Sequence, residues 1–402
     1  MKRKVFSQLS IMMFLEFFVW GAWFVTIANF MSEIGMTKYV YWAYTVGPIA
    51  SIVSPFFLGM VADRFFPTEK VLGVMHIIGG VAMFCAPFVI FSPLLFILTL
   101  GLHTLCYQPT IGLANTLAFS QITNQEKEFP IIRVFGTVGW IAAGIFVSGI
   151  LGADKTDIPL RVSGIVGVIL GLFCFSLPHT PPPAKNKSTT FREIIGLDAL
   201  KQLSSKPFKI YILSSLLTCI PLAAYYSYSQ MLIADVGFSK PGFTLSFGQM
   251  SEVIFIILLP VFLKKFGFKR TLAMGMLAWM VRYVAFAMGS PESVTWMIFF
   301  GIILHGICYD FFFVTGQIYV DKKSTPEIRG QAQGFNVLVT LGVGMLIGTQ
   351  VTGRIFNSIV TSGGTERMLQ WQAFWLIPAI IATAVLIFFM MTFRDKHVDH
   401  IK

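Results

Sequence analysis

Twelve apolar stretches of membrane-spanning length constrain this 402-residue chain more than any other feature of its sequence. A helix that crosses a bilayer needs about 20 mostly apolar residues, because each residue advances the helix by only about 1.5 Å. Windows of that length predict helices over 8–31, 41–62, 71–92, 94–118, 131–151, 160–178, 208–233, 245–265, 271–289, 294–317, 330–355 and 371–392. Segments so closely spaced leave no room for a soluble catalytic domain.

The amino-acid composition indicates that the lipid bilayer is the solvent of this chain. Hydrophobic residues make up 55% and charged residues only 12%, whereas a soluble domain has about 25% charged residues. The apolar run after "MKRK" continues to Met31, contains Glu16 and has no small-x-small cleavage site. We therefore interpret it as the first membrane helix and not as a signal peptide.

The net charge of +11 reflects membrane topology. Most of the 30 Lys and Arg residues fall in the two terminal tails and in every second loop between the predicted helices. This is the positive-inside asymmetry, and it predicts that both termini are cytoplasmic. No basic patch with interleaved aromatic residues is needed to explain the charge, so nucleic acid is not expected as a partner.

The cysteine residues are scattered singly within the predicted helices. They are Cys85, Cys106, Cys174, Cys219 and Cys308. Because they form neither a CxxC pair nor an even framework, we expect small packing residues there. The sequence predicts no disulfide, no metal site and no cofactor.

A segment rich in Pro, Lys and Ser divides the twelve predicted helices into six and six. We expect an N-terminal six-helix bundle over 1–178, a cytoplasmic linker over 179–207 and a C-terminal six-helix bundle over 208–402. Parallel six-helix repeats are the architecture of major facilitator transporters. The expected fold class is an all-α membrane protein with the major facilitator fold.

The loop between the second and third predicted helices contains the spacing Gly59-x-x-x-Asp63-Arg64. It resembles the signature of the major facilitator superfamily, in which an acid and a base hold the cytoplasmic helix ends together in one conformation. Asp63 and Arg64 are therefore predicted gating residues. The alternative is ordinary charged-loop chemistry on the cytoplasmic side.

Two polar stripes lie on otherwise apolar helices. An ionisable group at membrane depth costs about 2.5–3.5 kcal/mol on insertion scales, so it usually faces a cavity or a partner. Gln249 and Glu252 in "FGQMSEVIFIILLP" share one helix face, as do Arg133, Thr137 and Trp140 in "FPIIRVFGTVGWIAAG". We interpret both stripes as substrate-binding walls. The alternatives are a hydrogen bond between packed helices and an arginine that snorkels to the headgroups.

The stretch "HGICYDFFFVTGQ" places Asp310 in one of the most apolar parts of the chain. His305 and Tyr309 lie one turn apart on one face, with Asp310 beside them. The H-x4-D spacing also fits lipid acyltransferases. However, five residues rotate an α-helix by about 500°, which leaves His305 and Asp310 about 140° apart. We therefore favour a proton-carrying role for Asp310 over an enzyme.

Several further groups within the predicted helices have two interpretations each. Tyr225 in "PLAAYYSYSQ" offers a ring and a hydroxyl to a substrate, or anchors its helix at the interface. Glu16 is a proton site or the partner of a buried base. Arg282 is expected to form a structural ion pair. His76 and His103 are expected to be lone, satisfied core groups.

Five motifs, taken together, resemble the bacterial nucleoside:proton symporters of the major facilitator superfamily. They are "FPIIRVFGTVGW", "QMSEVIFI", "CYDFFFVTGQIYVDKK", "EIRGQAQG" and "WQAFWLIPA", and the likeness covers nearly the whole chain. The resemblance implies a substrate and proton site that includes Arg133, Thr137, Trp140, Gln249, Glu252 and Asp310.

The chain departs from that family's pattern at several site positions. Leu222 and Tyr225 stand where characterised relatives have amides, His305 where they have a tyrosine, and Glu16 where they have a glutamine. His305 and Tyr309 stay in the predicted substrate site. These departures leave open which nucleoside, or which close analogue, is bound.

The resemblance implies a proton-coupled symporter that imports nucleosides, with nucleoside, protons and the lipid bilayer as partners. A nucleobase suits aromatic residues such as Trp140, Tyr225 and Tyr309, and ribose hydroxyls suit carboxylate and amide groups. Asp310 is the first choice for proton coupling, followed by Glu252 and Glu16. The alternative is a proton-coupled symporter for a sugar or another polar solute. We expect a monomer in the cytoplasmic membrane of a bacterium.

Overall fold

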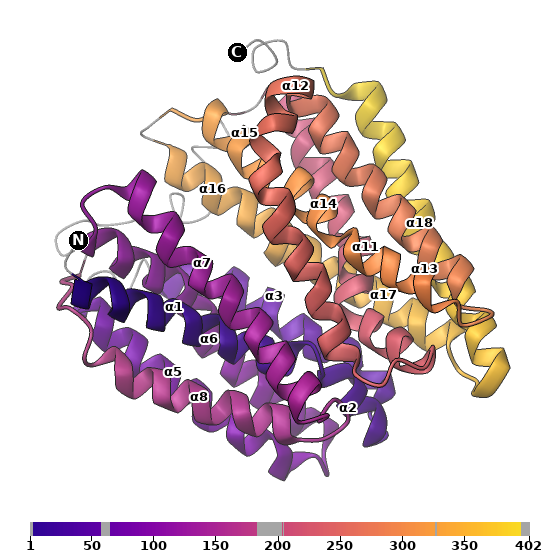
Figure 1. Cartoon of the computed structure of the whole chain (residues 1–402), viewed down its shortest axis with the longest axis horizontal. Coiled ribbons are helices and arrows are strands. Elements are labelled where there is room, and N and C mark those ends of the chain that lie inside the picture. Colours follow the sequence, from indigo (N-terminus) through magenta and orange to yellow (C-terminus); the bar gives the residue numbers. More distant parts are fainter. Residues whose placement is uncertain (1–2, 58–64, 183–202, 204, 326–327, 395–402) are drawn as a thin grey trace. The chain divides into compact units, whose positions relative to one another are not determined.

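The computed structural model describes residues 3–57, 65–182, 203, 205–325 and 328–394 (Figure 1). Within these residues the regular structure is helical throughout. The chain divides into two compact units, Met1–Thr190 and Phe191–Lys402. The division falls inside the segment that the sequence predicts as a linker, and the bundle boundaries at 178 and 208 stay predictions.

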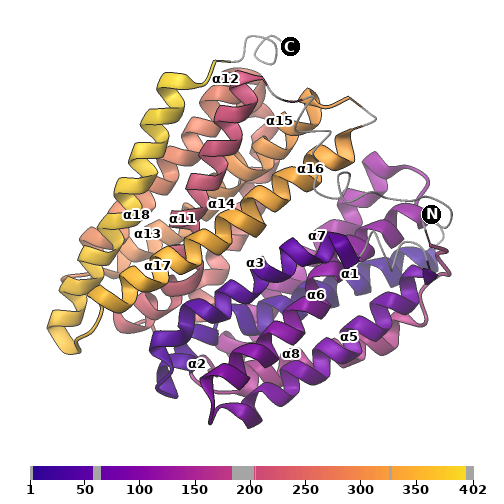
Figure 2. The same ribbon diagram turned by 180° about the vertical axis from the view of Figure 1, so that it is seen from behind.

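The N-terminal unit is a bundle of long helices with short helical turns between them. Its helices are α1 (Arg3–Phe24), α2 (Ile27–Glu33), α3 (Val40–Phe57), α5 (Thr68–Cys85), α6 (Pro93–Gln121), α7 (Gln125–Gly144) and α8 (Ile158–Cys174). Helix α7 continues into a π-helical turn over Ile145–Ile150. Helix α6 packs against both α3 and α5, and α1 packs against α7 and α8 (Figure 2).

The C-terminal unit contains more interrupted helices. They are α11 (Lys206–Asp235), α12 (Pro241–Gly289), α13 (Thr295–Ile303), α14 (His305–Tyr309), α15 (Thr315–Lys323), α16 (Arg329–Val337), α17 (Met345–Ile359) and α18 (Gly364–Thr392). Two π-helical turns, η5 (Asp310–Val314) and η6 (Leu338–Gly344), join α14 to α15 and α16 to α17. Helix α12 packs against α14 and α18.

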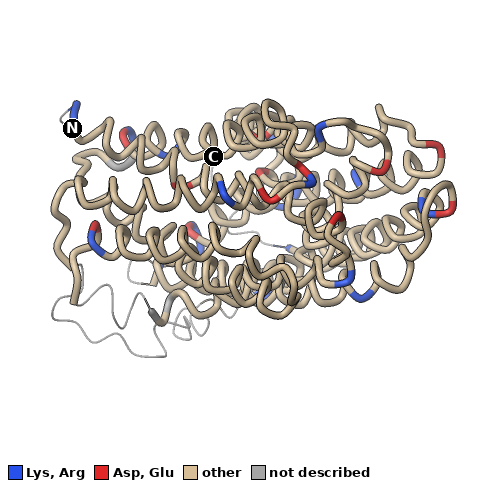
Figure 3. The backbone as a smooth tube through the Cα atoms, turned by 90° about the horizontal axis from the view of Figure 1, so that it is seen from below, with Lys and Arg blue, Asp and Glu red and all other residues tan. Residues whose placement is uncertain are grey.

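Each predicted membrane segment overlaps helix over most of its described residues. Nine helical spans of the described chain are long and apolar enough to cross a membrane. One of them, α12, covers the predicted segments 245–265 and 271–289, which meet at Gly267, where φ is +71°. The two remaining segments correspond to α3 and α8. Long stretches of the tube in Figure 3 carry no charged residue, as a bilayer-spanning chain requires. The predicted all-α membrane class is confirmed.

The predicted membrane segment 294–317 is not one regular helix. It is built from α13, α14, the π-helical turn η5 and α15, with η5 beginning at Asp310. The Thr315 hydroxyl donates to the backbone carbonyl of Asp310 at 3.2 Å. A π-helical turn changes the angular spacing of side chains and often occurs at functional sites. Asp310 therefore sits where the regular helix is interrupted.

Glycines allow pairs of helices in each unit to approach closely. A Cβ at Gly80 of α5 would lie 2.7 Å from the backbone nitrogen of Val168 on α8. A Cβ at Gly139 of α7 would overlap the Phe14 carbonyl oxygen on α1. Membrane helices use small residues in this way because lipid supplies no hydrophobic force to drive the helices together.

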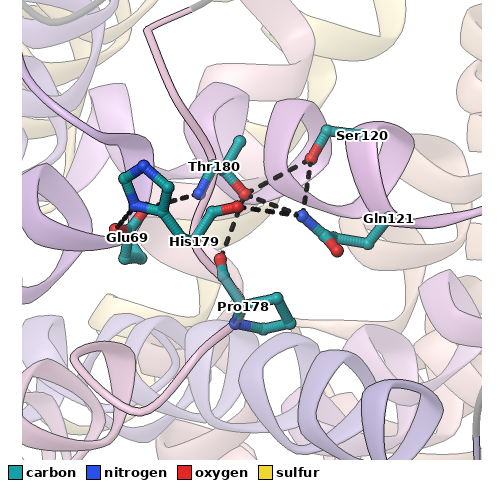
Figure 4. A network of polar contacts seen from close by, with 6 residues as sticks. All are labelled: Glu69, Ser120, Gln121, Pro178, His179 and Thr180. Carbon is teal, nitrogen blue, oxygen red and sulfur yellow. Dashed lines mark hydrogen bonds and ion pairs between the residues drawn. The ribbon is translucent and has the colours of Figure 1, made fainter.

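A polar network at one end of the N-terminal unit holds the chain that follows α8 (Figure 4). The buried carboxylate of Glu69, at the start of α5, lies 2.9 Å from Nδ1 of His179 and accepts from the Thr180 backbone N–H at 3.0 Å. The Thr180 hydroxyl in turn accepts from Gln121 at 3.1 Å, and the Thr68 N–H donates to the Thr180 carbonyl. The exit of the chain from this bundle is thereby fixed.

The close contact of α1 with α7 predicts that Gly139→Ala destabilises the protein. Because the new methyl group would meet a backbone carbonyl, a helix must shift, at a cost of about 1–3 kcal/mol for overpacking. We expect the unfolding midpoint in detergent to fall by roughly 5 °C. Gly101→Ala in α6 is the control, since its Cβ would meet only Val46 at an ordinary 3.6 Å. Equal midpoints for the two variants would contradict the proposed contact.

Candidate functional site

The predicted stripe on α7 is only partly buried and lies against α1. The guanidinium carbon of Arg133 stands 4.1 Å from the centre of the Phe17 ring, a cation–π arrangement. Gly136 makes this possible, because a Cβ there would come within 2.6 Å of the Arg133 guanidinium and 2.7 Å of Phe17. Thr137 and Trp140 follow along the same helix and are also partly buried.

Trp140 belongs to an aromatic cluster contributed by α1, α3, α6 and α7. Its ring meets Trp20 edge-on at 5.1 Å and Phe24 at 5.8 Å between centroids. Trp20 also contacts Tyr107 at 5.9 Å, and Phe24 contacts Tyr44 at 5.0 Å. Next to Arg133, this cluster combines flat apolar surfaces with guanidinium hydrogen-bond donors. Such a combination suits a planar heterocycle that carries polar substituents.

Glu16 is completely buried and hydrogen-bonded from two other helices. Its Oε2 lies 2.7 Å from Nε2 of His76 on α5, and its Oε1 lies 2.7 Å from the Thr110 hydroxyl on α6. The Tyr107 hydroxyl donates to the Glu16 backbone carbonyl at 2.7 Å. Of the two interpretations given to Glu16, the structure shows a partner for a buried base.

The prediction for His76 as a lone core group is wrong, because His76 is the base that pairs with Glu16. His103 is a core group as predicted, but only one of its ring nitrogens is satisfied, because the buried Nε2 has no described partner. Its Nδ1 lies 2.9 Å from the Gly79 carbonyl and must donate to it, and its ring stacks on Tyr107 at 5.8 Å. Sequence reasoning missed His76, Thr110 and Tyr107 as a group, since they stand on two different helices.

In the C-terminal unit, three aromatic rings form a stack whose middle ring lies beside an acid. Tyr225 of α11 stacks on His305 at 5.3 Å, and His305 stacks on Tyr309 at 5.9 Å. Nε2 of His305 lies 3.9 Å from the Glu252 carboxylate on α12. Tyr225 and His305 are buried, whereas Tyr309 and Glu252 are partly exposed. The outer end of the stack is therefore the accessible part.

Asp310 has no exposed surface, and neither of its carboxyl oxygens has a hydrogen-bond partner among the described residues. It is close enough to Glu252 for the two carboxyls to interact electrostatically. The buried side-chain oxygen of Gln249 also has no described partner. An unpaired carboxylate in such a place is costly, so a proton or a ligand is needed to stabilise it.

No hydrogen bond or ion pair among the described residues joins His305 to Asp310. The H-x4-D spacing therefore does not assemble an acyltransferase dyad among the described residues. No group of three or more His, Cys, Asp or Glu side chains in the described chain could hold a metal ion.

The ion pair predicted for Arg282 is wrong for the described part of the chain. Its side chain is completely buried, and Nε donates to the Gly301 carbonyl at 2.9 Å. The guanidinium lies 4.2 Å from the Tyr225 ring centre and 5.0 Å from that of Trp279, while both terminal nitrogens have no described partner. Aromatic faces take the place of the expected counter-ion.

The remaining site predictions are only partly covered by the structure. The predicted gating residues Asp63 and Arg64 lie outside the described residues. The ten other positions fall into two groups, one in each unit. Glu16, Arg133, Thr137 and Trp140 belong to the N-terminal unit, and Tyr225, Gln249, Glu252, His305, Tyr309 and Asp310 to the C-terminal unit.

Comparison with known proteins identifies the class of molecule. YegT of Escherichia coli (strain K12) is 38% identical over 408 residues, which is 98% of this chain and 95% of that protein. The nucleoside permease NupG of Escherichia coli (strain K12) is 30% identical, over 97% of this chain and 96% of its own. A crystal structure of the nucleoside transporter NupG superposes with a TM-score of 0.85 at 28% identity, covering 98% of this chain and all of the other.

The structural match confirms the predicted major facilitator fold for this multi-pass membrane protein. The sequence profile described as "Nucleoside H+ symporter" matches residues 2–398, almost the whole chain. A match of this extent confirms the family indicated by the five sequence motifs. The chain therefore belongs to the nucleoside H+ symporter family, whose members are transporters and not enzymes.

Proposed function

We propose that this protein imports nucleosides across the cytoplasmic membrane of a bacterium by proton-coupled symport with alternating access. Asp310 is the observation that carries the proposal. In a chain of this family, a carboxyl group without exposed surface or described hydrogen-bond partner lies near a second carboxyl, Glu252. Two such groups in a membrane helix bundle favour binding of a proton, since both cannot be charged at low cost.

Substrate recognition is proposed to use the polar and aromatic groups of each unit in different ways. In the N-terminal unit, Trp140 offers an aromatic face and Arg133 a planar set of donors, with the Thr137 hydroxyl between them along α7. A nucleobase presents the matching flat ring and acceptor atoms. These partly buried groups support a role in binding the base.

In the C-terminal unit, the accessible polar groups suit ribose. Glu252 is an acceptor for ribose hydroxyls, and Gln249 both accepts and donates. His305 stands next to Glu252, and Tyr309 stacks on His305. Tyr225 supports His305 from the buried side, so its proposed contribution is to hold the histidine ring in place. The buried amide oxygen of Gln249, which has no described partner, gains most from a substrate hydroxyl.

Proton coupling is proposed to centre on Asp310, with Glu252 as its neighbour. A nucleoside is neutral, so it needs no counter-charge and leaves a buried carboxyl free to carry a proton. Protonation from the outer side would remove the cost of an unpaired charge, and release to the cytoplasm would restore it. Glu16, the third predicted proton site, belongs to the N-terminal unit and lies in a separate cluster.

The remaining proposals concern placement in the membrane. The distribution of Lys and Arg supports cytoplasmic termini, and the relatives from Escherichia coli support the inner membrane.

Asp63 and Arg64 are proposed to hold the cytoplasmic helix ends together in one conformation. We propose a monomer, because one chain contains both six-helix sets of the fold.

Uptake into proteoliposomes tests the function directly. With an imposed pH gradient, acid outside, we expect labelled uridine or adenosine to accumulate above its equilibrium level. Collapse of the gradient with a protonophore should leave only equilibration. Unlabelled nucleosides should compete, whereas ribose, disaccharides and free bases should not. Competition by a sugar alone would favour the alternative solute class, and accumulation without a gradient would contradict symport.

Replacement of the coupling carboxyl tests the role of Asp310. Asp310→Asn keeps the size of the side chain but cannot lose a proton, so we expect gradient-driven accumulation to disappear. Exchange of labelled for unlabelled nucleoside should continue. Asp157→Asn is the control, since Asp157 is a half-exposed acid paired with Arg161 at 2.7 Å. Full uphill uptake by Asp310→Asn would rule out this assignment.

The planar guanidinium of Arg133 predicts a specific loss of apparent affinity. Arg133→Lys keeps the charge but removes the second donor edge and the stacking on Phe17, so KM should rise about tenfold. Arg161→Lys is the matched control, because Arg161 also lies near a phenylalanine ring, 5.1 Å from Phe88, but belongs to a surface ion pair. An unchanged KM in initial-rate measurements would remove Arg133 from the proposed site.

A further inference from the structure

Glu16 and His76 form a buried acid–base pair. Glu16 has no exposed surface and His76 is 3% exposed. The carboxylate oxygen and the ring nitrogen are 2.7 Å apart, compared with 3.9 Å for Glu252 and His305. The pair joins α1 to α5, and Thr110 adds α6. It is a separate site from Asp310, which belongs to the other unit.

Thr110 can serve the Glu16 carboxyl whether or not it carries a proton. Its hydroxyl oxygen lies 2.7 Å from Glu16 Oε1 and 2.6 Å from the Tyr107 carbonyl. If Glu16 is ionised, the Thr110 hydroxyl donates to the carboxylate. If Oε1 carries the proton, the carboxyl donates to Thr110, and Thr110 donates to the Tyr107 carbonyl instead. A hydroxyl has one donor and two acceptor lone pairs, which permits both arrangements.

His76 provides the same freedom at the other oxygen. A neutral imidazole with its proton on Nε2 donates to an ionised Oε2, and the opposite tautomer accepts from a protonated Oε2. Neither gain nor loss of one proton therefore leaves Glu16 with an unpaired buried oxygen. A pair that only stabilised the fold would need partners for one protonation state. This arrangement has partners for both.

The net charge of the Glu16–His76 pair changes with its proton. With one shared proton the pair is neutral, and without it the pair carries one negative charge in a fully buried position. Burial penalises net charge. Proton release requires compensation by a cation or by water when the conformation changes.

The groups that face the pair come from each neighbouring helix. Helix α6 contributes Tyr107 and also His103, which interacts electrostatically with His76. Helix α7 contributes Arg133. Both Arg133 and Glu16 interact electrostatically with Tyr107. Helix α8 contributes Cys174. Arg133 is the cation of this set. It lies over Phe17, the residue after Glu16, so the pair is connected to the proposed base-binding side chains.

We propose that Glu16 and His76 form a second proton-binding site, which loads one proton from outside and releases it to the cytoplasm in every transport cycle. Two protons then accompany each nucleoside, one at Asp310 and one at this pair. The inference rests on the proposed function. The step is a protonation only: the pair changes from one negative charge to neutral and back, and no other bond is made or broken.

A reversal-potential measurement counts the protons. Because a nucleoside is neutral, the charge moved per nucleoside equals the number of protons. Proteoliposomes receive a tenfold uridine gradient without a pH gradient, and the voltage that stops net uridine flux is measured. One coupled proton balances the gradient at about 59 mV and two balance it at about 30 mV. We expect about 30 mV for the unmodified protein.

The decisive variant is Glu16→Gln, which keeps the shape and the hydrogen-bond partners but cannot exchange a proton. We expect its balancing voltage to rise to about 59 mV while uptake remains coupled. His76→Gln removes the base and should give the same balancing voltage. This second variant keeps the test possible if Glu16→Gln folds poorly. Glu33→Gln is the control, since Glu33 is an exposed acid 3.7 Å from Lys155, and it should keep about 30 mV.

The outcomes separate this inference from the proposed function. Equal voltages for the unmodified protein and Glu16→Gln would overturn the second site while leaving symport through Asp310 intact. An unmodified protein that needs about 59 mV would do the same. If neither a voltage nor a pH gradient drives uridine uptake, the proposed function is wrong, and the proposal of a second proton-binding site is wrong as well.

Discussion

The cost of burying charge in a bilayer is the constraint on which the rest of this structure depends. Apolar side chains make up 55% of the sequence, so each ionisable group inside a helix must be paired, protonated or in contact with a ligand. The two units meet this requirement differently. Glu16 is bonded on both oxygens, whereas Asp310 has no described partner on either. Glu16 therefore keeps its hydrogen bonds when it gains or loses a proton, whereas Asp310 needs a proton or a ligand to be stabilised.

Aromatic rings stabilise buried arginines in this structure, as counter-ions do in soluble proteins. Arg133 lies over Phe17, and Arg282 lies over Tyr225 and near Trp279. A ring face attracts a cation without adding a second charge, so the pair has a smaller desolvation penalty than an ion pair. In the C-terminal unit the same Tyr225 ring stacks on His305, which connects a buried cation to the accessible Glu252 through two rings. Changes in this stack would alter the site without touching the substrate.

The sequence predicted the helices well, because hydropathy over 20 residues reports directly on the bilayer. Side chains on one helix were also placed correctly relative to each other, as Arg133 and Trp140 show. Partners on different helices were not predictable. His76 is 60 residues from Glu16 and Thr110 is 94 residues away, and no periodicity within one helix relates them. The sequence predicts an ion pair for Arg282, yet the residue is completely buried against an aromatic ring that comes from another helix.

The resemblance to the family and the physics of burial give different information about the same positions. Family membership identifies a nucleoside H+ symporter. The resemblance of the sequence motifs implies that Glu16 stands where characterised relatives have a glutamine. A glutamine can make the same hydrogen bonds but cannot exchange a proton. The acid in this chain stands opposite a histidine that can share its proton, so the difference is chemical and not merely steric. Where a chain departs from its family at a buried, fully bonded position, the departure is evidence about its own energetics.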